Sequence, residues 1–315
     1  TQTEKVDVRH LRAMLSTLAD VGAEKLLVMV NPDLVPMPLA GVPKDQGIPI
    51  VHLKGTPEQM GLQHGSMVKE AAIYNMNRTL HGVGLASTVE TGLWFPGELE
   101  KAWKQQEKYI PERFVREIDA MADATGMPQD WARAVNIFPE FFHCSGLALR
   151  GKATVDGKLY HGRILDYMTD IGLQNTAVIM VFEPKDHNAW VSISYAGFCS
   201  TVSAMNEKGL SMGEMGGRGN GYLDGIPMSM MMREIMERFE TVQESLDYMK
   251  KTPRTCEYFY VLTDSTTKDM AGVASWASKL AQEKGHEDLQ IILPGKAHEL
   301  LPRPFEDVVL MSAGD

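Results

Sequence analysis

The sequence predicts an α+β fold, because helical patterns dominate the chain up to about Asn136 and short strand patterns follow Cys144. A length of 315 residues is enough to bury a sizeable core in one large domain or two smaller ones. We predict a helical segment over residues 1–143 and a strand-rich part over residues 144–315. Together they are expected to form one globular domain.

The first part of the chain is interpreted from its apolar spacing and its prolines. Residues 9–30 carry a leucine-rich stripe at helical spacing, and five prolines between 32 and 49 predict an extended connector. Residues 48–53 form a short strand pattern. The run Gly55-Thr56-Pro57-Glu58 is typical of a helix start, with proline in the first turn.

The second part contains one helical block and many short strands. The helical block covers residues 228–249. Alternating or β-branched runs predict strands at residues 146–149, 159–165, 177–182, 189–195, 200–205, 210–212, 258–263, 270–274, 290–293 and 308–311.

Composition narrows the classes of partner. With 31 Lys and Arg against 41 Asp and Glu, the net charge of −10 disfavours nucleic acid and anionic membranes. No apolar run approaches the ~20 residues of a membrane span. Three cysteines do not make a disulfide framework, since an odd number leaves a thiol free. Because the first residue is Thr1, removal of a signal peptide from an exported protein and a cytoplasmic location both stay open.

Cys144 is the strongest candidate for chemistry. An apolar strand begins at this thiol, the chain turns at Asp156-Gly157, and a second strand carries Arg163 and Asp166. An antiparallel hairpin of this length returns both side chains to the neighbourhood of the thiol. A nearby cation favours the thiolate, and a carboxylate can hold an amine. The hairpin therefore predicts a nucleophile with its supporting groups in one segment.

Three stretches together resemble the cysteine N-terminal-nucleophile (Ntn) hydrolases, and within them the acyl-coenzyme A:6-aminopenicillanate acyltransferase branch (peptidase family C45). The first is the run from Leu53 to Gly65, LKGTPEQMGLQHG. The second is the Cys144 hairpin with Gly162-Arg163-x-x-Asp166, which choloylglycine hydrolases and penicillin V acylases share. The third is Met205-Asn206-Glu207-Lys208-Gly209-Leu210.

The resemblance implies a four-layer αββα sandwich and a precursor that cleaves itself at His143–Cys144. The α-amino group freed at Cys144, with a pKa of ~8, would then serve as general base. The resemblance also implies roles for two side chains: Arg163 would favour the thiolate, and Asp166 would orient the amine. The expected activity is that of an autoactivated amide hydrolase or acyltransferase.

The chain departs from the family pattern at the oxyanion donors. Where choloylglycine hydrolases carry an asparagine, the count from Asn206 arrives at Gly216, which offers only its backbone N–H. A later family asparagine falls near Ser312. The oxyanion or substrate candidates are therefore Asn206, Gly216, Ser312 and Tyr195. Most family members continue beyond this point, so a truncated C-terminus is one interpretation of the end at Asp315.

Simpler interpretations stand beside these. Cys144 alone could be a small buried residue, and Asp166 could form a structural ion pair with Arg163. A papain-like enzyme with His161 or His143 as base would act without backbone cleavage. A catalytically inactive relative that binds a small amphipathic ligand is the alternative in another class.

The remaining motifs are assigned structural roles. Cys199 and Cys256 are expected to be core thiols, and His64 a helix-packing residue. The methionines of residues 228–236 are expected to pack into the core, with an acyl-chain pocket as the minority interpretation. The run from Gly213 to Gly221 lacks phosphate-loop and dinucleotide spacing and is interpreted as a flexible loop bordering the pocket.

The expected ligand is a small-molecule amide or acyl-thioester. No cofactor is expected, and no metal site, because the nine histidines show no ligand spacing with cysteines or carboxylates. Self-association into a homo-oligomer is left open.

Overall fold

The computed structural model describes residues 44–45, 47–84, 88–89, 92, 95–137, 144–165, 172–216, 222–285, 287–295 and 306–312. The chain forms two compact units. Among the described residues, unit 1 contains 44–137 and 172–201, and unit 2 contains 144–165 and 202–312. The units thus divide the chain differently from the two predicted segments, since residues 172–201 cluster with the N-terminal helices. The helix predicted for residues 9–30 lies outside the described residues. Of the connector predicted between residues 32 and 49, only residues 44–45 and 47–49 are described, and they include β1 and the start of β2.

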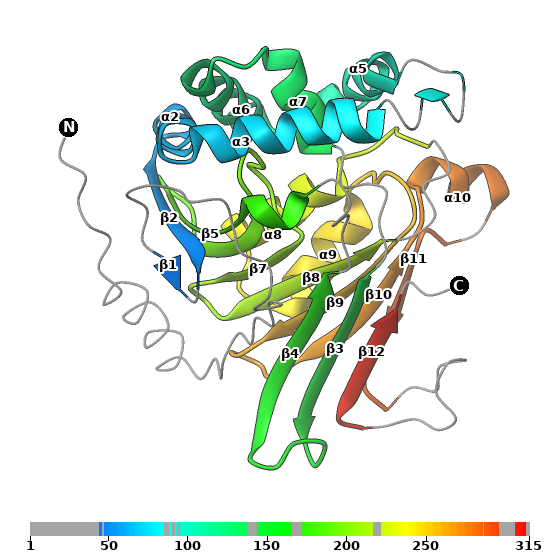
Figure 1. Cartoon of the computed structure of the whole chain (residues 1–315). Coiled ribbons are helices and arrows are strands. Elements are labelled where there is room, and N and C mark those ends of the chain that lie inside the picture. Colours follow the sequence, from blue (N-terminus) through cyan, green and yellow to red (C-terminus); the bar gives the residue numbers. More distant parts are fainter. Residues whose placement is uncertain are drawn as a thin grey trace. The chain divides into compact units, whose positions relative to one another are not determined.

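Unit 1 combines helices with a four-strand sheet segment (Figure 1). Its strands follow the order β1-β2-β5-β6, in which β2 and β5 are parallel and the other neighbours are antiparallel. The helical character predicted for this part is confirmed. The elements are β1 (Lys44–Asp45), β2 (Ile48–Gly55), α2 (Pro57–Met67), α3 (Lys69–Asn77), the π-helix η1 (Arg78–Val83), α5 (Phe95–Gln106), η2 (Glu107–Tyr109), α6 (Glu112–Thr125), α7 (Gln129–Ile137), η3 (Leu173–Thr176), β5 (Ala177–Pro184) and β6 (Trp190–Tyr195).

The predicted helix start after Gly55 is confirmed as a capping box. The Thr56 hydroxyl accepts a hydrogen bond from the N–H of Gln59, and the Gln59 side chain accepts one from the N–H of Thr56. Two glycines on this helix face α6. A Cβ at Gly61 would lie 2.2 Å from the Glu117 carbonyl oxygen, and one at Gly65 would lie 2.6 Å from the Met121 oxygen. Glycine is therefore required where the two helices meet.

A buried polar cluster ties three helices of unit 1 to the turn after β6. Asn75 on α3 donates to the Ala196 oxygen (2.8 Å), and His64 on α2 accepts from the Gly197 N–H (2.9 Å). Asn136 on α7 donates to the Gly197 oxygen (3.1 Å) and accepts from the Cys199 N–H (2.7 Å). We call His64, Asn75, Asn136 and Cys199 the His64 cluster. The packing role predicted for His64 and the core position of Cys199 are confirmed, since both are fully buried.

The described residues of unit 2 form two antiparallel sheets and three helices. One sheet segment has the order β7-β8-β9-β10-β11, and the other has the order β12-β3-β4. The predicted strands are all present, whereas α10 was not predicted. The elements are β3 (Cys144–Gly151), β4 (Gly157–Leu165), β7 (Ser203–Asn206), β8 (Leu210–Gly216), α8 (Met228–Arg238), α9 (Val242–Lys251), β9 (Tyr258–Asp264), β10 (Met270–Ser275), α10 (Ser278–Lys284), β11 (Leu289–Ile292) and β12 (Val308–Ser312).

The two sheets of unit 2 pack face to face and enclose a core. Every residue of β8 and of β10 is buried, as expected for strands covered on both faces. Helices α8 and α9 pack on the same sheet, so unit 2 has the order helix, sheet, sheet (Figure 1). The predicted α+β class is confirmed, and three of the four predicted layers form within unit 2. The core residues are Cys144, Ala148, Met215, Val261, Met270, Ala274, Ile292, Val309 and Met311.

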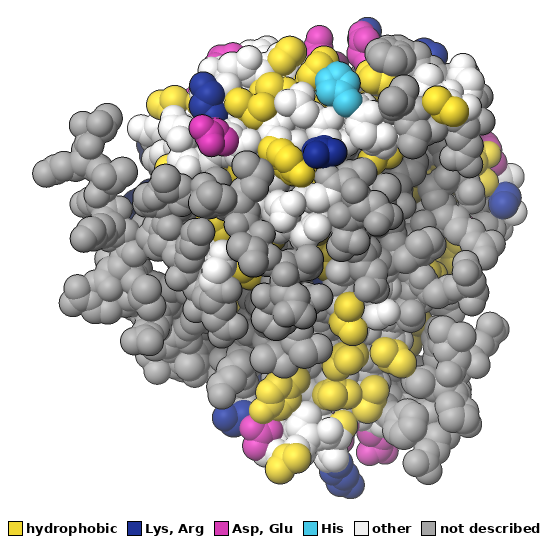
Figure 2. Space-filling view, in the orientation of Figure 1, with side chains coloured by type: hydrophobic (Ala, Val, Ile, Leu, Met, Phe, Trp, Pro, Cys, Tyr) yellow, Lys and Arg dark blue, Asp and Glu magenta, His cyan; other side chains and the backbone are white. Residues whose placement is uncertain are grey.

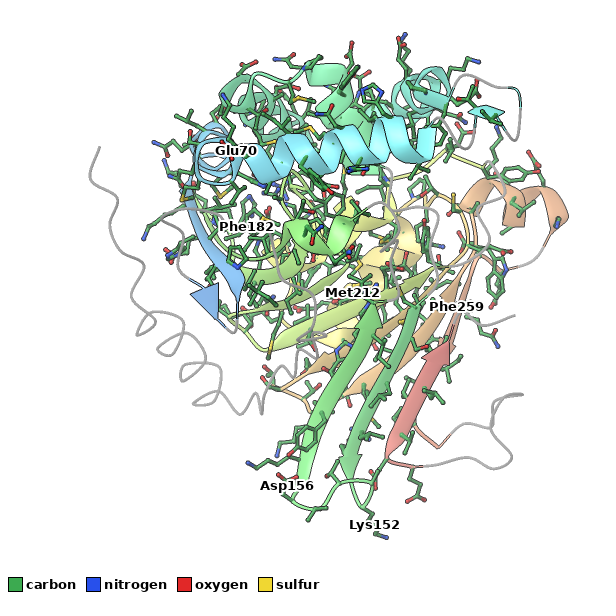
Figure 3. All side chains as sticks on the ribbon, in the orientation of Figure 1. Glu70, Lys152, Asp156, Phe182, Met212 and Phe259 are labelled. Atoms are coloured by element: carbon green, nitrogen blue, oxygen red, sulfur yellow. The ribbon has the colours of Figure 1, made fainter. Side chains whose placement is uncertain are left out.

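The outer face of the smaller sheet is apolar. Ile164 on β4 and Leu310 on β12 are 48% and 43% exposed. Figure 2 shows hydrophobic side chains gathered over these strands. Lys152 and Asp156 lie at the tip of the β3–β4 hairpin, beyond this apolar surface (Figure 3).

The methionines of α8 are core residues, as predicted. All of them are 2% exposed or less, namely Met228, Met230, Met231, Met232 and Met236. The predicted single helical block is two helices, because Phe239 leaves α8 in an extended conformation before Thr241 caps α9 with its own capping box. Among the described residues, no helix is both long enough and apolar enough to cross a bilayer.

Candidate active site

Cys144 is the first residue of β3 and lies in the core between the two sheets of unit 2, with 2% of its surface exposed. The hairpin inferred from the sequence is present: β3 and β4 are antiparallel, with Cys144 opposite Leu165 and Gly146 opposite Arg163. In a strand, alternate residues share a face, so Arg163 and Leu165 lie on the face that Cys144 occupies. This register brings Arg163 to the thiol.

The Arg163 guanidinium joins the thiol to a carboxylate. Its Nη2 donates to Cys144 Sγ at 3.0 Å and to Glu214 Oε1 at 3.0 Å, and its Nε donates to the Glu214 carbonyl oxygen at 3.0 Å. The Arg163 and Glu214 side chains are 7% and 3% exposed. Two bonds to a single residue fix the guanidinium plane, and the third directs a permanent cation at the sulfur.

The carbonyl group of Glu214 can accept a hydrogen bond from Arg163 because the regular pairing of β8 with β7 stops at Gly213, the residue before Glu214. The last β7–β8 pair is Ser203 with Gly213. The Glu214 N–H donates to the Val202 oxygen at 3.1 Å, whereas its carbonyl accepts from Arg163. Glu214 was not among the site residues predicted from the sequence. A usable signal was present, since it is the only charged residue in the buried strand Leu-Ser-Met-Gly-Glu-Met-Gly.

Burial raises the pKa of Glu214 to about 7, although the positive charge of Arg163 acts to lower it. The carboxyl group therefore titrates near neutrality instead of near pH 4.5. A group that changes charge next to Arg163 alters how strongly the guanidinium is held and how much of its charge acts on Cys144.

Three buried polar atoms of this region have no hydrogen-bond partner among the described residues. They are Arg163 Nη1, Glu214 Oε2 and His161 Nε2. Buried donors and acceptors are normally satisfied, and exceptions concentrate where a ligand or water binds. We call Cys144, His161, Arg163 and Glu214 the Cys144 cluster.

His161 faces the same core but is not placed to act on Cys144. Its Nδ1 lies 2.7 Å from Ser211 Oγ, and it pairs with Ala148, four residues from Cys144 along β3. That separation is about 13 Å along the strand. Burial, with Arg163 nearby, lowers the pKa of His161 to about 4. The papain-like interpretation with His161 as base is therefore wrong.

Asn206 is fully occupied by hydrogen bonds within its own surroundings. Its Nδ2 donates to the Met236 and Phe239 oxygens, and its Oδ1 accepts from the Lys208 and Leu210 N–H groups. Both amide hydrogens and both lone pairs are used. The expectation that Asn206 donates to an oxyanion is corrected: this side chain shapes the turn between β7 and β8 and ties it to the end of α8.

The other candidates are positioned by their strands. Gly216 is the last residue of β8, opposite Tyr258, and Ser312 on β12 lies opposite Ser145, next to Cys144 along β3. Tyr195 is in unit 1, at the end of β6. The loop predicted from Gly213 is wrong for its first residues, since β8 continues through Gly216.

Asp166 and His143 lie outside the described residues, as do residues 217–221. Among the residues that are described, no group of three or more His, Cys, Asp or Glu side chains could hold a metal ion.

Comparison with known proteins gives a family match. The family model "Acyl-coenzyme A:6-aminopenicillanic acid acyl-transferase" matches residues 154–286. This stretch contains Arg163 and Glu214 and begins after Cys144.

Three curated relatives are similar at low identity. The chain is 24% identical over 237 residues to protein dcd1B of Dictyostelium discoideum (67% of this chain, 47% of the relative). It is 26% identical over 275 residues to protein dcd1A of the same organism (73% and 59%). An uncharacterized protein of Archaeoglobus fulgidus is 21% identical over 312 residues (82% and 51%). The chain spans about half the length of these relatives.

Two solved structures are similar to parts of the chain. One is a Caenorhabditis elegans N-acylethanolamine-hydrolyzing acid amidase orthologue (TM-score 0.40, 14% identity, 55% of this chain and 70% of that chain). The other is a mutant conjugated bile acid hydrolase from Clostridium perfringens (TM-score 0.32, 18% identity, 48% and 50%). The family match confirms the resemblance over residues 154–286, which include the second strand of the hairpin with Arg163 and the Asn206 turn.

Proposed function

We propose that this chain is an amide hydrolase or acyltransferase that acts through an acyl-thioester on Cys144, after cleavage of its own His143–Cys144 bond. The observation that carries the proposal is the Arg163 Nη2–Cys144 Sγ contact of 3.0 Å, held by two further bonds from Arg163 to Glu214. The match to an acyltransferase family supports the reaction class.

Self-cleavage begins with attack of the Cys144 sulfur on the His143 carbonyl carbon. The C–N bond breaks as the C–S bond forms, and the Cys144 nitrogen takes up the proton that the thiol lost and becomes an amine. Water then hydrolyses the thioester, which leaves a carboxylate on His143 and returns the thiol. The steps require no cofactor and no histidine base.

Turnover repeats this chemistry on an external substrate. The Cys144 thiolate, favoured by Arg163, attacks the acyl carbon of an amide or thioester. The leaving group, an amine from an amide or a thiol from a thioester, takes a proton from the Cys144 α-ammonium group, which had received it from the Cys144 thiol. Water or an acceptor amine then attacks the acyl-thioester and releases the acyl group. Asp166 is assigned to orient the α-amine, and the Gly216 N–H and the Ser312 hydroxyl are the candidate oxyanion donors.

The test is the mass of the purified protein together with turnover of a chromogenic N-acyl amide panel. We expect wild-type protein to separate into fragments that begin at Thr1 and at Cys144, and Cys144→Ala to remain intact and inactive. Cys199→Ala is the matched control: it removes a buried thiol of unit 1 and should cleave and turn over within about twofold of wild type.

Wild-type protein that remains one intact chain after prolonged incubation, without turnover, would contradict the proposal. Binding of an amphipathic amide under those conditions would favour the inactive, ligand-binding alternative. Activity that survives in an intact chain would instead indicate a thiol enzyme without autoprocessing.

A further inference from the structure

The aliphatic part of Arg163 runs through a confined space between the two sheets of unit 2. A Cβ at Gly213 would lie 2.8 Å from Arg163 Cγ, 3.3 Å from Arg163 Cβ and 3.4 Å from His161 Nε2. Carbon atoms do not approach to 2.8 Å without displacement. Because Gly213 on β8 has no side chain, the aliphatic part of Arg163 and the His161 ring can both pack close to its backbone.

His161 borders this space and is anchored from the opposite sheet. Its Nδ1 lies 2.7 Å from Ser211 Oγ, and Ser211 Oγ lies 2.7 Å from Thr263 Oγ1. Ser211 and Thr263 are direct cross-strand partners on β8 and β9. The two hydroxyl groups hold the imidazole, which precedes Arg163 by two residues on the same face of β4.

We propose that Gly213 and His161 are positioning residues that confine the stem of Arg163, so that its guanidinium reaches Cys144 in the orientation that favours the thiolate. This inference rests on the proposed function of Cys144. A long arginine side chain has many rotamers, and a stem held between a glycine and a fixed ring samples few of them.

The ring is suited to this role because it stays neutral. Arg163 is the charged side chain that acts on the ring. A charged imidazole beside Arg163 would repel the guanidinium, and the lowered pKa of His161, about 4, is in accord with a ring that remains uncharged at neutral pH.

The experiment follows the alkylation of Cys144 by iodoacetamide as a function of pH, with the modified peptide identified by mass spectrometry. This measures thiolate formation without requiring turnover. We expect Gly213→Ala to shift the midpoint of the profile upward by about one pH unit and to slow alkylation at pH 7 by about tenfold. Gly162→Ala is the matched control. Its Cβ would meet Leu147 Cγ on the outer face at 3.3 Å, and its midpoint should be that of wild type.

Three variants separate positioning from general stability. His161→Ala should shift the midpoint in the same direction, His161→Phe should restore part of the shift because it replaces the ring, and Ser211→Ala should produce a smaller shift. A purely structural role would lower the melting temperature of these proteins and leave the midpoint unchanged.

A wild-type midpoint in folded Gly213→Ala and His161→Ala would overturn the inference. If Gly213→Ala does not fold, the His161 variants and Ser211→Ala decide by the same measurement. Failure of the proposed function has a different signature, in which wild-type Cys144 itself alkylates with the profile of an ordinary thiol and turns over no amide.

Discussion

Each unit buries a cysteine beside a nitrogen-bearing side chain, and the two surroundings differ in how completely their polar groups are satisfied. In the His64 cluster of unit 1, Cys199 Sγ lies 3.8 Å from His64 Nδ1, and the surrounding amides bond to the backbone of one turn. In the Cys144 cluster of unit 2, Arg163, Glu214 and His161 each keep one buried atom without a hydrogen-bond partner in the described part of the chain.

The comparison teaches how to separate structural polar groups from functional ones. A satisfied buried network orders the backbone and stabilises a turn. A buried charge with unused hydrogen-bonding capacity costs stability, and such cost is found where a ligand, a water molecule or a transition state supplies the missing partner. By this criterion the surroundings of Cys144 have the character of a functional site, and those of Cys199 have the character of a structural network.

The largest expected effect comes from Arg163→Lys. Lysine carries one compact charge and cannot bond Glu214 twice while contacting the sulfur, so turnover should fall by at least about 100-fold. Initial rates on an N-acyl amide measure this. Arg238→Lys is the control, because Arg238 is about half exposed on α8 and pairs with Glu234, and its rate should change by less than about twofold. Equal rates in wild type and Arg163→Lys would remove the distinction between the two clusters.

Asn136→Ala tests the other side of the comparison. The change leaves the Cys199 N–H and the Gly197 oxygen buried without their partner, which should lower the free energy of unfolding by about 3 kcal/mol. Turnover per folded molecule should be unchanged. Chemical denaturation and rates corrected for the folded fraction give both quantities.

The matched control for Asn136→Ala is Gln129→Ala, an exposed position that bonds Asp123, where the change should stay within about 0.5 kcal/mol. Loss of turnover in folded Asn136→Ala would show that the His64 cluster does more than order its turn.

The smallest expected effects are two opposite pH dependences of stability. The pKa of Glu214 is raised to about 7 in the folded chain. Its stabilising contribution to the free energy of unfolding is therefore fully present below pH 4.5 and is lost as pH rises to about 7. The pKa of His161 is lowered from 6.5 to about 4, so its contribution is present above pH 6.5 and is lost as pH falls to about 4. In the wild type the two trends oppose each other between pH 4.5 and pH 6.5.

Replacing one of the two residues should reveal the trend due to the other. The free energy of unfolding should change by about 2 kcal/mol across the pH range of each titration. Glu214→Gln should retain only the destabilisation on acidification, so its melting temperature should fall relative to wild type as pH decreases from 6.5 to 4. His161→Gln should retain the opposite trend, with a relative loss of stability from pH 4.5 to pH 7. Parallel melting-temperature curves for all three proteins would contradict the buried titrations.

Local patterns were sufficient to predict the α+β class, the strands of unit 2 and the start of α2. Alternation of apolar side chains, the Asp156-Gly157 turn and the Thr56–Gln59 capping box act between residues a few positions apart. The approach of Arg163 to Cys144 was predicted for the same reason, since a hairpin register carries it. The break after Arg238 was missed although the Thr241–Glu244 capping box marks it locally. The short helix α10 was missed because no side-chain cap marks its start.

Only the tertiary structure decided which polar residues surround the thiol. Glu214 is 51 residues from Arg163, and Ser211 is 50 residues from His161, so no local pattern reports either pairing. The same holds for Asn206, whose amide is consumed by the end of α8 some 30 residues away. The sequence by itself determined that Arg163 lies beside Cys144, because both residues lie on one hairpin. The burial of Cys144 and Arg163, and the shifted pKa values of the groups around them, arise only when the two sheets of unit 2 pack together and exclude water.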